Sequence, residues 1–163
     1  MDRSFILVRT LLVFGLAVWL TLILINNLTD PGTNVYLIGQ MISMTALKLD
    51  GVMGRGLLWR ALESPALAKI LLNGVVIVQF FTVLLLWRAA IHWVRVLRAR
   101  PARAIAATNQ ALAAFLGLWF LFLCGGLWFG YWMKMGPVQQ VHMTLVIISL
   151  LSLIAVNMQP ANR

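Results

Sequence analysis

The two histidines, His92 and His142, are the side chains best suited to hold a metal ion or a haem iron. A pair of imidazoles facing each other between helices could hold a haem. His92 follows the apolar stretch 70–87, whereas His142 lies near the start of the stretch 138–158. At a rise of about 1.5 Å per residue and a hydrocarbon core of about 30 Å, they are expected at opposite faces of a membrane. This excludes a bis-histidine haem within one chain and leaves open a haem shared with a partner, or histidines bonded to headgroups and loop carbonyls.

Other catalytic chemistry has little support in the apolar stretches, which contain no Asp, Glu or Lys. Ionisable groups inside a membrane usually mark proton or ion pathways, so their absence argues against a pump. Neutral polar residues more often form hydrogen bonds between helices than bind substrate. They are Asn73, Gln79, Gln110, Thr144, Ser152 and Asn157. The lone Cys124 is interpreted as a small buried hydrophobic residue. We therefore predict a protein without catalytic or metal-binding residues.

The composition places the chain in a membrane. Of the 163 residues, 62% are hydrophobic and 10% are charged, and the mean hydropathy is +0.93. A soluble domain is nearer half apolar and a quarter charged, so too few polar groups are present to cover a surface in water. The net charge of +9 does not indicate nucleic-acid binding, because the arginines flank apolar stretches.

Four stretches are long enough to cross a bilayer within one integral membrane domain, 1–163. We predict an all-α, four-helix transmembrane bundle with spans at about 4–26, 66–98, 104–133 and 138–158. The first stretch lacks a cleavage pattern for a signal peptide and is interpreted as an uncleaved span. Ser64 suits the N-cap of the second span, and Pro65 suits its first turn.

The segment between the first two spans predicts an interfacial helical cap at 35–64. Asp30, Pro31 and Gly32 indicate a turn in which Asp caps, Pro fixes φ and Gly takes a left-handed corner. A helix is expected over 35–49, then a glycine-rich break and a short helix over 57–62. Four residues are expected to fix the loop that enters the cap: Asn26, Asn27, Asp30 and Asn34.

The distribution of basic residues predicts the orientation. Eight of the thirteen Lys and Arg residues lie at the termini or around the connection between the second and third spans. The positive-inside rule therefore places both termini in the cytoplasm and the cap outside. Trp87 and Trp93 are expected in an inner aromatic belt, and Trp59, Trp128 and Trp132 in an outer one.

Two distinctive blocks stand out in the sequence: Asn26-Asn27-Leu28-Thr29-Asp30, and Trp59-Arg60-Ala61 with Ser64-Pro65. Together they resemble a bacterial family known only as predicted small integral membrane proteins. Shorter matches are Thr33-Asn34, Ser43-Met44, Gly125-Gly126 with Trp128-Phe129, and Asn157 with Gln159-Pro160. The resemblance covers nearly the whole chain and implies four transmembrane helices, a structured outer loop and no established activity. It places the protein in the inner membrane of a bacterium.

Four positions depart from the pattern of that family. Family members usually carry an acid where this chain has Thr45, Gln79 and Leu127, and commonly a histidine at Gln40. All four side chains are neutral here. If the family performs proton or ligand chemistry through those groups, the departures indicate that this member kept the scaffold as a structural subunit.

The preferred function is a non-catalytic accessory or assembly subunit of a larger membrane complex. Its partners would be the lipid bilayer and other membrane subunits or further copies of itself, with no cofactor other than lipid. Gly126 and Gly130 form a G-x-x-x-G step that permits close approach of a neighbouring backbone, from a partner or from this chain. The predicted contact surface comprises Tyr36, Met41, Met44, Trp59, Arg60, Gly126 and Gly130.

Two alternatives stay open. The first is a membrane anchor that contributes to a quinone or haem site of a respiratory oxidoreductase, with His142, Trp128 and Trp132 at that site. The second is a small-solute transporter, which is weaker because four helices form a pathway only in an oligomer and no intramembrane charge would drive coupling.

Overall fold

The fold is entirely helical in a computed structural model that describes residues 3–96 and 101–158. The long helices are α1 (Arg3–Thr29), α4 (Pro65–Arg95), α5 (Pro101–Trp128) and α6 (Gly136–Asn157). The short ones are α2 (Pro31–Ile42), α3 (Thr45–Asp50) and the 3-10 helices η1 (Arg55–Arg60) and η3 (Tyr131–Met133). Four of these helices are long and apolar enough to cross a membrane, and the described residues include no strand, so the predicted fold class is confirmed.

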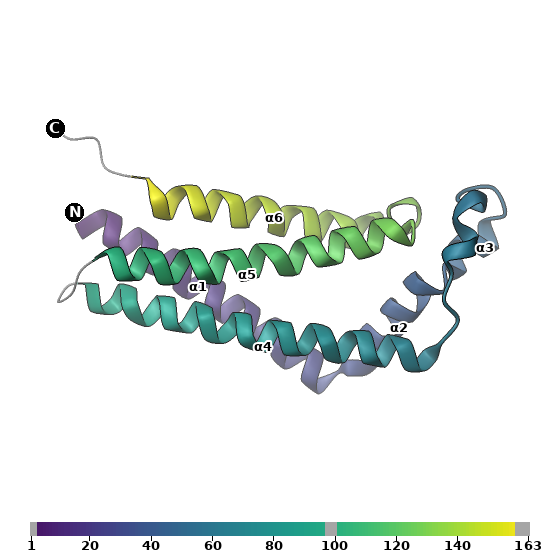
Figure 1. The fold of residues 1–163 in the computed structure, drawn as a ribbon, viewed down its shortest axis with the longest axis horizontal. Helices are drawn as coiled ribbons and strands as arrows, with labels where there is room; N and C mark the ends of the chain where they lie inside the picture. Colours follow the sequence, from purple (N-terminus) through teal and green to yellow (C-terminus); the bar gives the residue numbers. More distant parts are fainter. Residues whose placement is uncertain (1–2, 97–100, 159–163) are drawn as a thin grey trace.

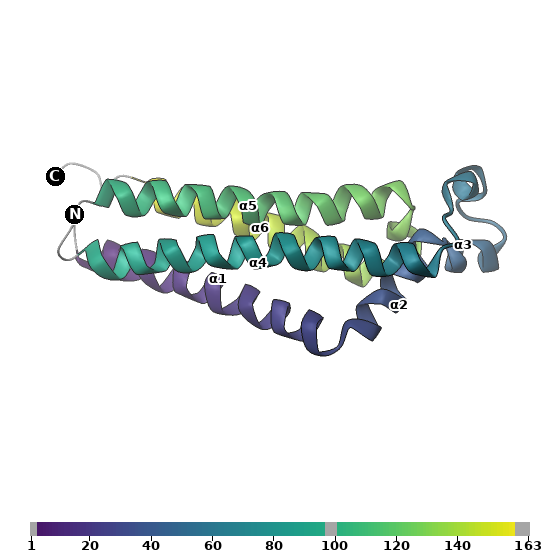
Figure 2. The same ribbon diagram turned by 60° about the horizontal axis from the view of Figure 1, so that its bottom comes forward.

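The long helices alternate in direction along the bundle (Figure 1). α4 packs between α1 and α5, and α6 packs on α5. α1 begins and α6 ends at the same end of the bundle, here called the termini end (Figure 1). α1 diverges from the bundle toward the other end, and α2 returns from there to pack against α4 (Figure 2). The residues after α2, 43–64, extend beyond the long helices at this second end, here called the cap end.

The outer surface of the bundle is as apolar as its interior. On α1 the buried side chains Val13, Leu20 and Leu24 repeat at helical spacing, while Leu11 and Leu22 on other faces are 62% and 55% exposed. Only 22% to 33% of the most apolar window of each long helix is buried within the protein. A helix that is apolar on all sides and covered on one requires hydrocarbon around the rest.

The termini end is closely packed because α4 and α5 meet through small side chains. Ala90 and Ala107 are buried between the helices, and the indole of Trp93 is completely buried beside them. Trp93 was expected in a lipid-facing belt, and this expectation is wrong. The indole lies in the core because its N–H finds a partner there, donating to Oγ1 of Thr108 at 2.8 Å.

Several helix boundaries differ from the predicted ones. α5 was expected to continue to residue 133 but ends at Trp128, because Gly130 adopts a left-handed φ of 67°. The expected cap helix 35–49 begins earlier, at Pro31, and is interrupted at Met44, which has a φ of 53°. Gly32 is not a left-handed corner, since it lies in the first turn of α2.

Two predicted caps are confirmed. The side chain of Asp30 accepts a hydrogen bond from the backbone N–H of Thr33 and starts α2. Ser64 accepts from the backbone N–H of Leu67 at 3.3 Å, with Pro65 in the first turn of α4. The last expected residues of the second span, 97 and 98, lie outside the described residues.

Candidate functional site

The cap is joined to the bundle by a buried amide network. Asn27 near the end of α1 donates to Oε1 of Gln79 on α4 at 2.7 Å, and accepts from Nδ2 of Asn34 on α2 at 2.7 Å. Asn27 and Gln79 are 8% and 1% exposed. Buried amides require partners, and these two hydrogen bonds connect α1, α2 and α4. Asn26, expected to act with them, is exposed and accepts through its backbone carbonyl from the N–H of Asp30.

A second connection is ionic and lies outside the long helices. Lys134, between α5 and α6, pairs with the carboxylate of Asp50 at the end of α3. That carboxylate also accepts from the backbone N–H groups of Val52 and Met53, at 3.1 and 2.9 Å. The hydrogen bond from Lys134 is the main cause that lowers the pKa of Asp50 to about 2. The pair therefore holds α3 against the connection between α5 and α6.

The two glycines of the G-x-x-x-G step act within this chain. A Cβ on Gly126 would lie 2.6 Å from the ring of Tyr131, so only glycine leaves room for that ring. Gly130 turns the chain through its left-handed φ and brings Tyr131 back against Gly126. Tyr131 is 3% exposed as a result, and burial raises the pKa of its hydroxyl. Contact of either glycine with a partner helix is not tested by this arrangement.

Four rings lie roughly parallel beside this turn. The ring of His142 on α6 faces that of Phe122, with the two centroids 4.7 Å apart. The ring centroids of Trp119 and Tyr131 lie 6.1 and 6.3 Å from the centroid of His142. The planes of these pairs differ by 19° to 22°. Three polar atoms of the group are buried without a hydrogen-bond partner: Nε1 of Trp119, Oη of Tyr131 and Nδ1 of His142. Buried polar atoms are usually paired, so this group of rings has unused hydrogen-bonding capacity.

Two neighbouring cavities open beside these rings. A cavity of about 120 Å³ is lined by His142, Tyr131, Asn27 and Asn34 together with apolar side chains from α2, α4 and α5. A larger one of about 480 Å³, here called the apolar groove, lies between α2, α4 and α5. Ile38, Met41, Val75 and Phe122 line both cavities. The small cavity and the groove therefore share part of their walls.

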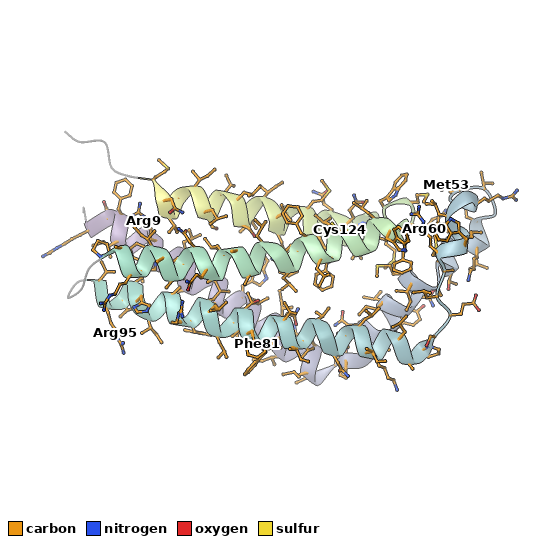
Figure 3. The ribbon with its side chains drawn as sticks, in the orientation of Figure 1. Arg9, Met53, Arg60, Phe81, Arg95 and Cys124 are labelled. Atoms are coloured by element: carbon orange, nitrogen blue, oxygen red, sulfur yellow. The ribbon has the colours of Figure 1, made fainter. Side chains whose placement is uncertain are left out.

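An exposed aromatic surface lies on the outside of the cap. The guanidinium of Arg60 lies 4.3 Å from the ring centroid of Trp128 and 5.2 Å from that of Trp59. Arg60 also donates to the backbone carbonyl of Trp128 at 3.1 Å, which joins η1 to α5. Trp59 and Trp128 are 73% and 50% exposed. Figure 3 shows Arg60 at the cap end of the bundle, far from Arg9 at the termini end.

The other predicted contact residues are dispersed. Tyr36 is 64% exposed, whereas Met44 is 2% exposed and turned into the cap. Met41 lines both cavities. Cys124, interpreted as buried, is exposed instead.

The ligand residues proposed from the sequence separate as well. His142 lies at the small cavity, but Trp128 and Trp132 are both at least half exposed and line neither of the two cavities. His92 lies in the last turn of α4, at the opposite end of the bundle from His142. Within 3–96 and 101–158, no three His, Cys, Asp or Glu side chains are grouped as a metal site would require.

Sequence reasoning missed the residues that give this site its character. Trp119 and Phe122 were not singled out, and Tyr131 fell within the predicted span 104–133. The sequence did contain a signal. Trp119 and Phe122 are three residues apart, which places them on one face of a helix, and Gly126 is followed five positions later by the aromatic Tyr131. Arg9 was counted only as a charge near the terminus, although it is 2% exposed.

Comparison with known proteins gives one match. Residues 5–159 match a family model described as "Predicted small integral membrane protein (DUF2165)". No curated protein and no solved structure matches the chain.

Proposed function

Because the chain belongs to this family of small integral membrane proteins, and its description names no reaction, we propose that it is a non-catalytic subunit of a larger membrane complex. In this proposal it resides in a bacterial inner membrane with both termini in the cytoplasm. Its cap end contacts another membrane protein and stabilises or assembles the complex.

The exposed apolar surface of the cap is the observation that carries the proposal. Leu49 is 83% exposed, Val52 79% and Trp59 73%, and all three lie outside the four long helices. Exposed aromatic and aliphatic groups outside a membrane span favour a protein contact or the headgroup layer. Tryptophan and arginine are also the residue types that contribute most at protein interfaces.

The rigidity of that surface favours a protein partner over the headgroup layer alone. Trp59 and Trp128 meet edge to face at 5.9 Å, and Arg60 stacks on both rings. An aromatic surface held in one arrangement loses less conformational entropy on binding than a mobile loop does. The proposed contact surface therefore consists of Trp59, Arg60 and Trp128, with Leu49 and Val52 beside them.

Photo-crosslinking in native membranes tests this proposal. A benzoylphenylalanine in place of Trp59 is expected to crosslink to one protein that mass spectrometry identifies and that reciprocal purification recovers with this chain. The same probe in place of Val94, which is 62% exposed near the other end of α4, provides the matched control. Arg60→Ala should reduce the crosslink at position 59 because the guanidinium no longer fixes the two rings.

The outcomes that would contradict the proposal are equally specific. Crosslinks from position 59 to lipid alone would assign the aromatic surface to the headgroup layer. Crosslinks only to a second copy of this chain would show that the surface forms a homo-oligomer and does not contact another protein. Equal protein crosslinking from positions 59 and 94 would show contact without a preferred surface.

A second candidate function is a membrane anchor that contributes to a quinone site. The observation that favours it is the unpartnered Nδ1 of His142 beside the apolar groove. Haem in the same role has less support, because His92 lies at the opposite end of the bundle and cannot provide the second axial ligand from this chain. Transport has less support too, since the buried cation Arg9 donates to the backbone carbonyls of Ala155 and Met158 at the end of α6.

A further inference from the structure

We propose that the cap end binds a membrane quinone, with a headgroup carbonyl at Tyr131 and His142 and the isoprenoid chain in the apolar groove. This proposal rests on the second candidate function and specifies its site, and it does not depend on the contact surface of the cap. It concerns binding only and assigns no electron transfer to the chain.

The apolar groove has the size and lining that a lipid-soluble chain requires. Its volume of about 480 Å³ falls within the range of about 300–1,000 Å³ that is usual for small-molecule sites. Its rim carries Ile70, Leu71 and Leu121, which are 64%, 40% and 55% exposed on the outer surface of the bundle. A ligand dissolved in the bilayer could therefore enter from the side, between α4 and α5.

The arrangement of the helices keeps this entrance open. α4 and α5 separate toward the cap end in the view of Figure 1. Gly74 and Gly125 line the groove, one on each of these helices, and a Cβ on either would meet no atom within 4 Å. These glycines leave empty space instead of permitting close packing.

The small cavity, which shares four lining residues with the groove, offers hydrogen bonds to a carbonyl oxygen. Only 3% of Tyr131 is exposed, and its Oη has no hydrogen-bond partner. Nδ1 of His142 is also buried and unpartnered, and both residues line the small cavity. A hydroxyl can donate one hydrogen bond, and a neutral imidazole carrying its proton on Nδ1 can donate another. An aprotic carbonyl oxygen accepts two such bonds.

The rings beside the small cavity favour a flat headgroup. Phe122 and His142 lie with planes 21° apart, and Tyr131 and His142 with planes 19° apart. A planar conjugated ring can extend such a stack with the offset geometry that aromatic groups prefer. A sterol or an acyl chain has no planar polar ring to match these faces.

The charge of the site selects against ionic lipids. No Lys, Arg, Asp or Glu is among the described residues that line either cavity. A phosphate or carboxylate headgroup would be desolvated there without a cation to pair with it, which is costly. A neutral, planar, carbonyl-bearing headgroup on an apolar chain is the chemistry of a membrane quinone.

Binding of decylubiquinone and menaquinone-4 to the purified full chain in lipid nanodiscs tests the proposal. The readout is the saturable part of tryptophan fluorescence quenching, since Trp119 lies against the rings that would stack on the headgroup. Simple partition into the lipid is not saturable. Quinone extracted from protein purified from its native membrane gives a second, independent readout.

Groove-filling variants separate a specific site from partition. Gly125→Leu and Gly74→Leu place a side chain in the groove without an initial clash and are expected to weaken binding at least about 10-fold. Gly117→Leu is the matched control: it lies on the exposed face of α5, also has no atom within 4 Å of its Cβ, and lines neither cavity. Its affinity for quinone should equal that of the unchanged chain.

A conservative variant then tests the headgroup end. Tyr131→Phe keeps the ring beside Gly126 and removes the hydroxyl, so an affinity loss of about 5- to 10-fold is expected, as for one lost hydrogen bond. The proposal is overturned if quenching by the unchanged chain does not saturate, or if Gly125→Leu binds quinone as well as Gly117→Leu does. Recovery of a phospholipid or fatty acid in place of quinone, displaced by Gly125→Leu, would also overturn it.

Discussion

The two ends of the bundle are built from similar residues and differ in how completely their polar groups are satisfied. At the termini end, Trp93 donates to Thr108, and Arg9 donates from Nε to the carbonyl of Ala155 at 3.2 Å. At the cap end, four buried side-chain atoms lack partners among the described residues. They belong to Arg60, Trp119, Tyr131 and His142.

Packing follows the same division. Ala90 and Ala107 are almost completely buried at the termini end, and Trp93 fills the space beside them. Toward the cap end, α4 and α5 separate, and the apolar groove and the small cavity lie between the elements there. Loose packing and unpaired polar atoms both lower the stability of the fold. Features that cost stability are often found at binding sites, and here both are concentrated at the cap end.

Arg9 shows how the termini end avoids such a cost. Its guanidinium is buried and lies 5.7 Å from the ring centroid of Trp93. It donates to the carbonyls of Ala155, in the last turn of α6, and of Met158, the residue that follows the helix. A single cation therefore satisfies one helix end and joins α1 to α6.

The largest expected effect is a loss of stability at the closely packed termini end. Trp93→Ala removes a fully buried indole and leaves Thr108 without its donor, so we expect a destabilisation of about 3–5 kcal/mol. Val94→Ala on the exposed face of α4 is the control, with an expected change of about 0.5 kcal/mol or less. Reversible unfolding in mixed micelles measures both. Equal changes would show that the two faces of α4 contribute alike.

A smaller effect is expected at the cap end, where Gly126 leaves room for the ring of Tyr131. Gly126→Ala places a methyl group 2.6 Å from the Tyr131 ring and is expected to cost about 1–3 kcal/mol through displacement of that ring. Gly125→Ala, one residue earlier, meets no atom within 4 Å and should be neutral or slightly stabilising. The same unfolding experiment compares the neighbours. If Gly126→Ala proves as stable as Gly125→Ala, Tyr131 does not depend on the space at Gly126.

The smallest effect concerns the ionic contact of α3. The pKa of Asp50 is lowered to about 2, mainly by its hydrogen bond with Lys134, whereas an unpaired Asp has a pKa of about 3.9. A carboxylate with a lowered pKa stabilises the fold fully above its unfolded value and loses this contribution as the pH falls toward 2. The protection of the α3 amides, which is the intrinsic exchange rate at each pH divided by the observed rate, should therefore be constant near neutral pH and fall between about pH 4 and 2.

Asp50→Asn provides the control for that measurement. The variant should exchange faster near neutral pH and lose the acid-dependent part of the change, because its amide does not titrate. The effect should be small, since an exposed ion pair is screened by water and salt. An unchanged pH profile in the variant would assign the acid sensitivity to other carboxylates, such as Glu63, which pairs with Lys48.

Much of the fold could be predicted because it depends on local sequence. Runs of about 20 apolar residues require hydrocarbon, and Ser64 and Asp30 start helices through bonds to residues three positions away. Helix ends set by glycine were harder. Gly130 ends α5 in a left-handed conformation, but Gly32 in an Asp-Pro-Gly turn does not adopt one.

The candidate site could not be predicted in the same way. Its residues come from α5, η3 and α6, and their pattern in the sequence is that of any apolar helix. In a chain that is apolar on all sides, hydropathy does not distinguish the lipid-facing side from the core. This is why Trp93 was expected to face lipid, and Cys124 to be buried, when each does the opposite.

The amino-acid sequence by itself determined the solvent of this protein, the number of its spans and the capping of two helices, because these follow from the hydrophobicity and short-range hydrogen bonding of neighbouring residues. Only the tertiary structure decided which polar atoms are satisfied. Arg9 reaches carbonyls near the other end of the chain, whereas Tyr131 and His142 face a cavity, and this difference depends on how separate helices pack against one another.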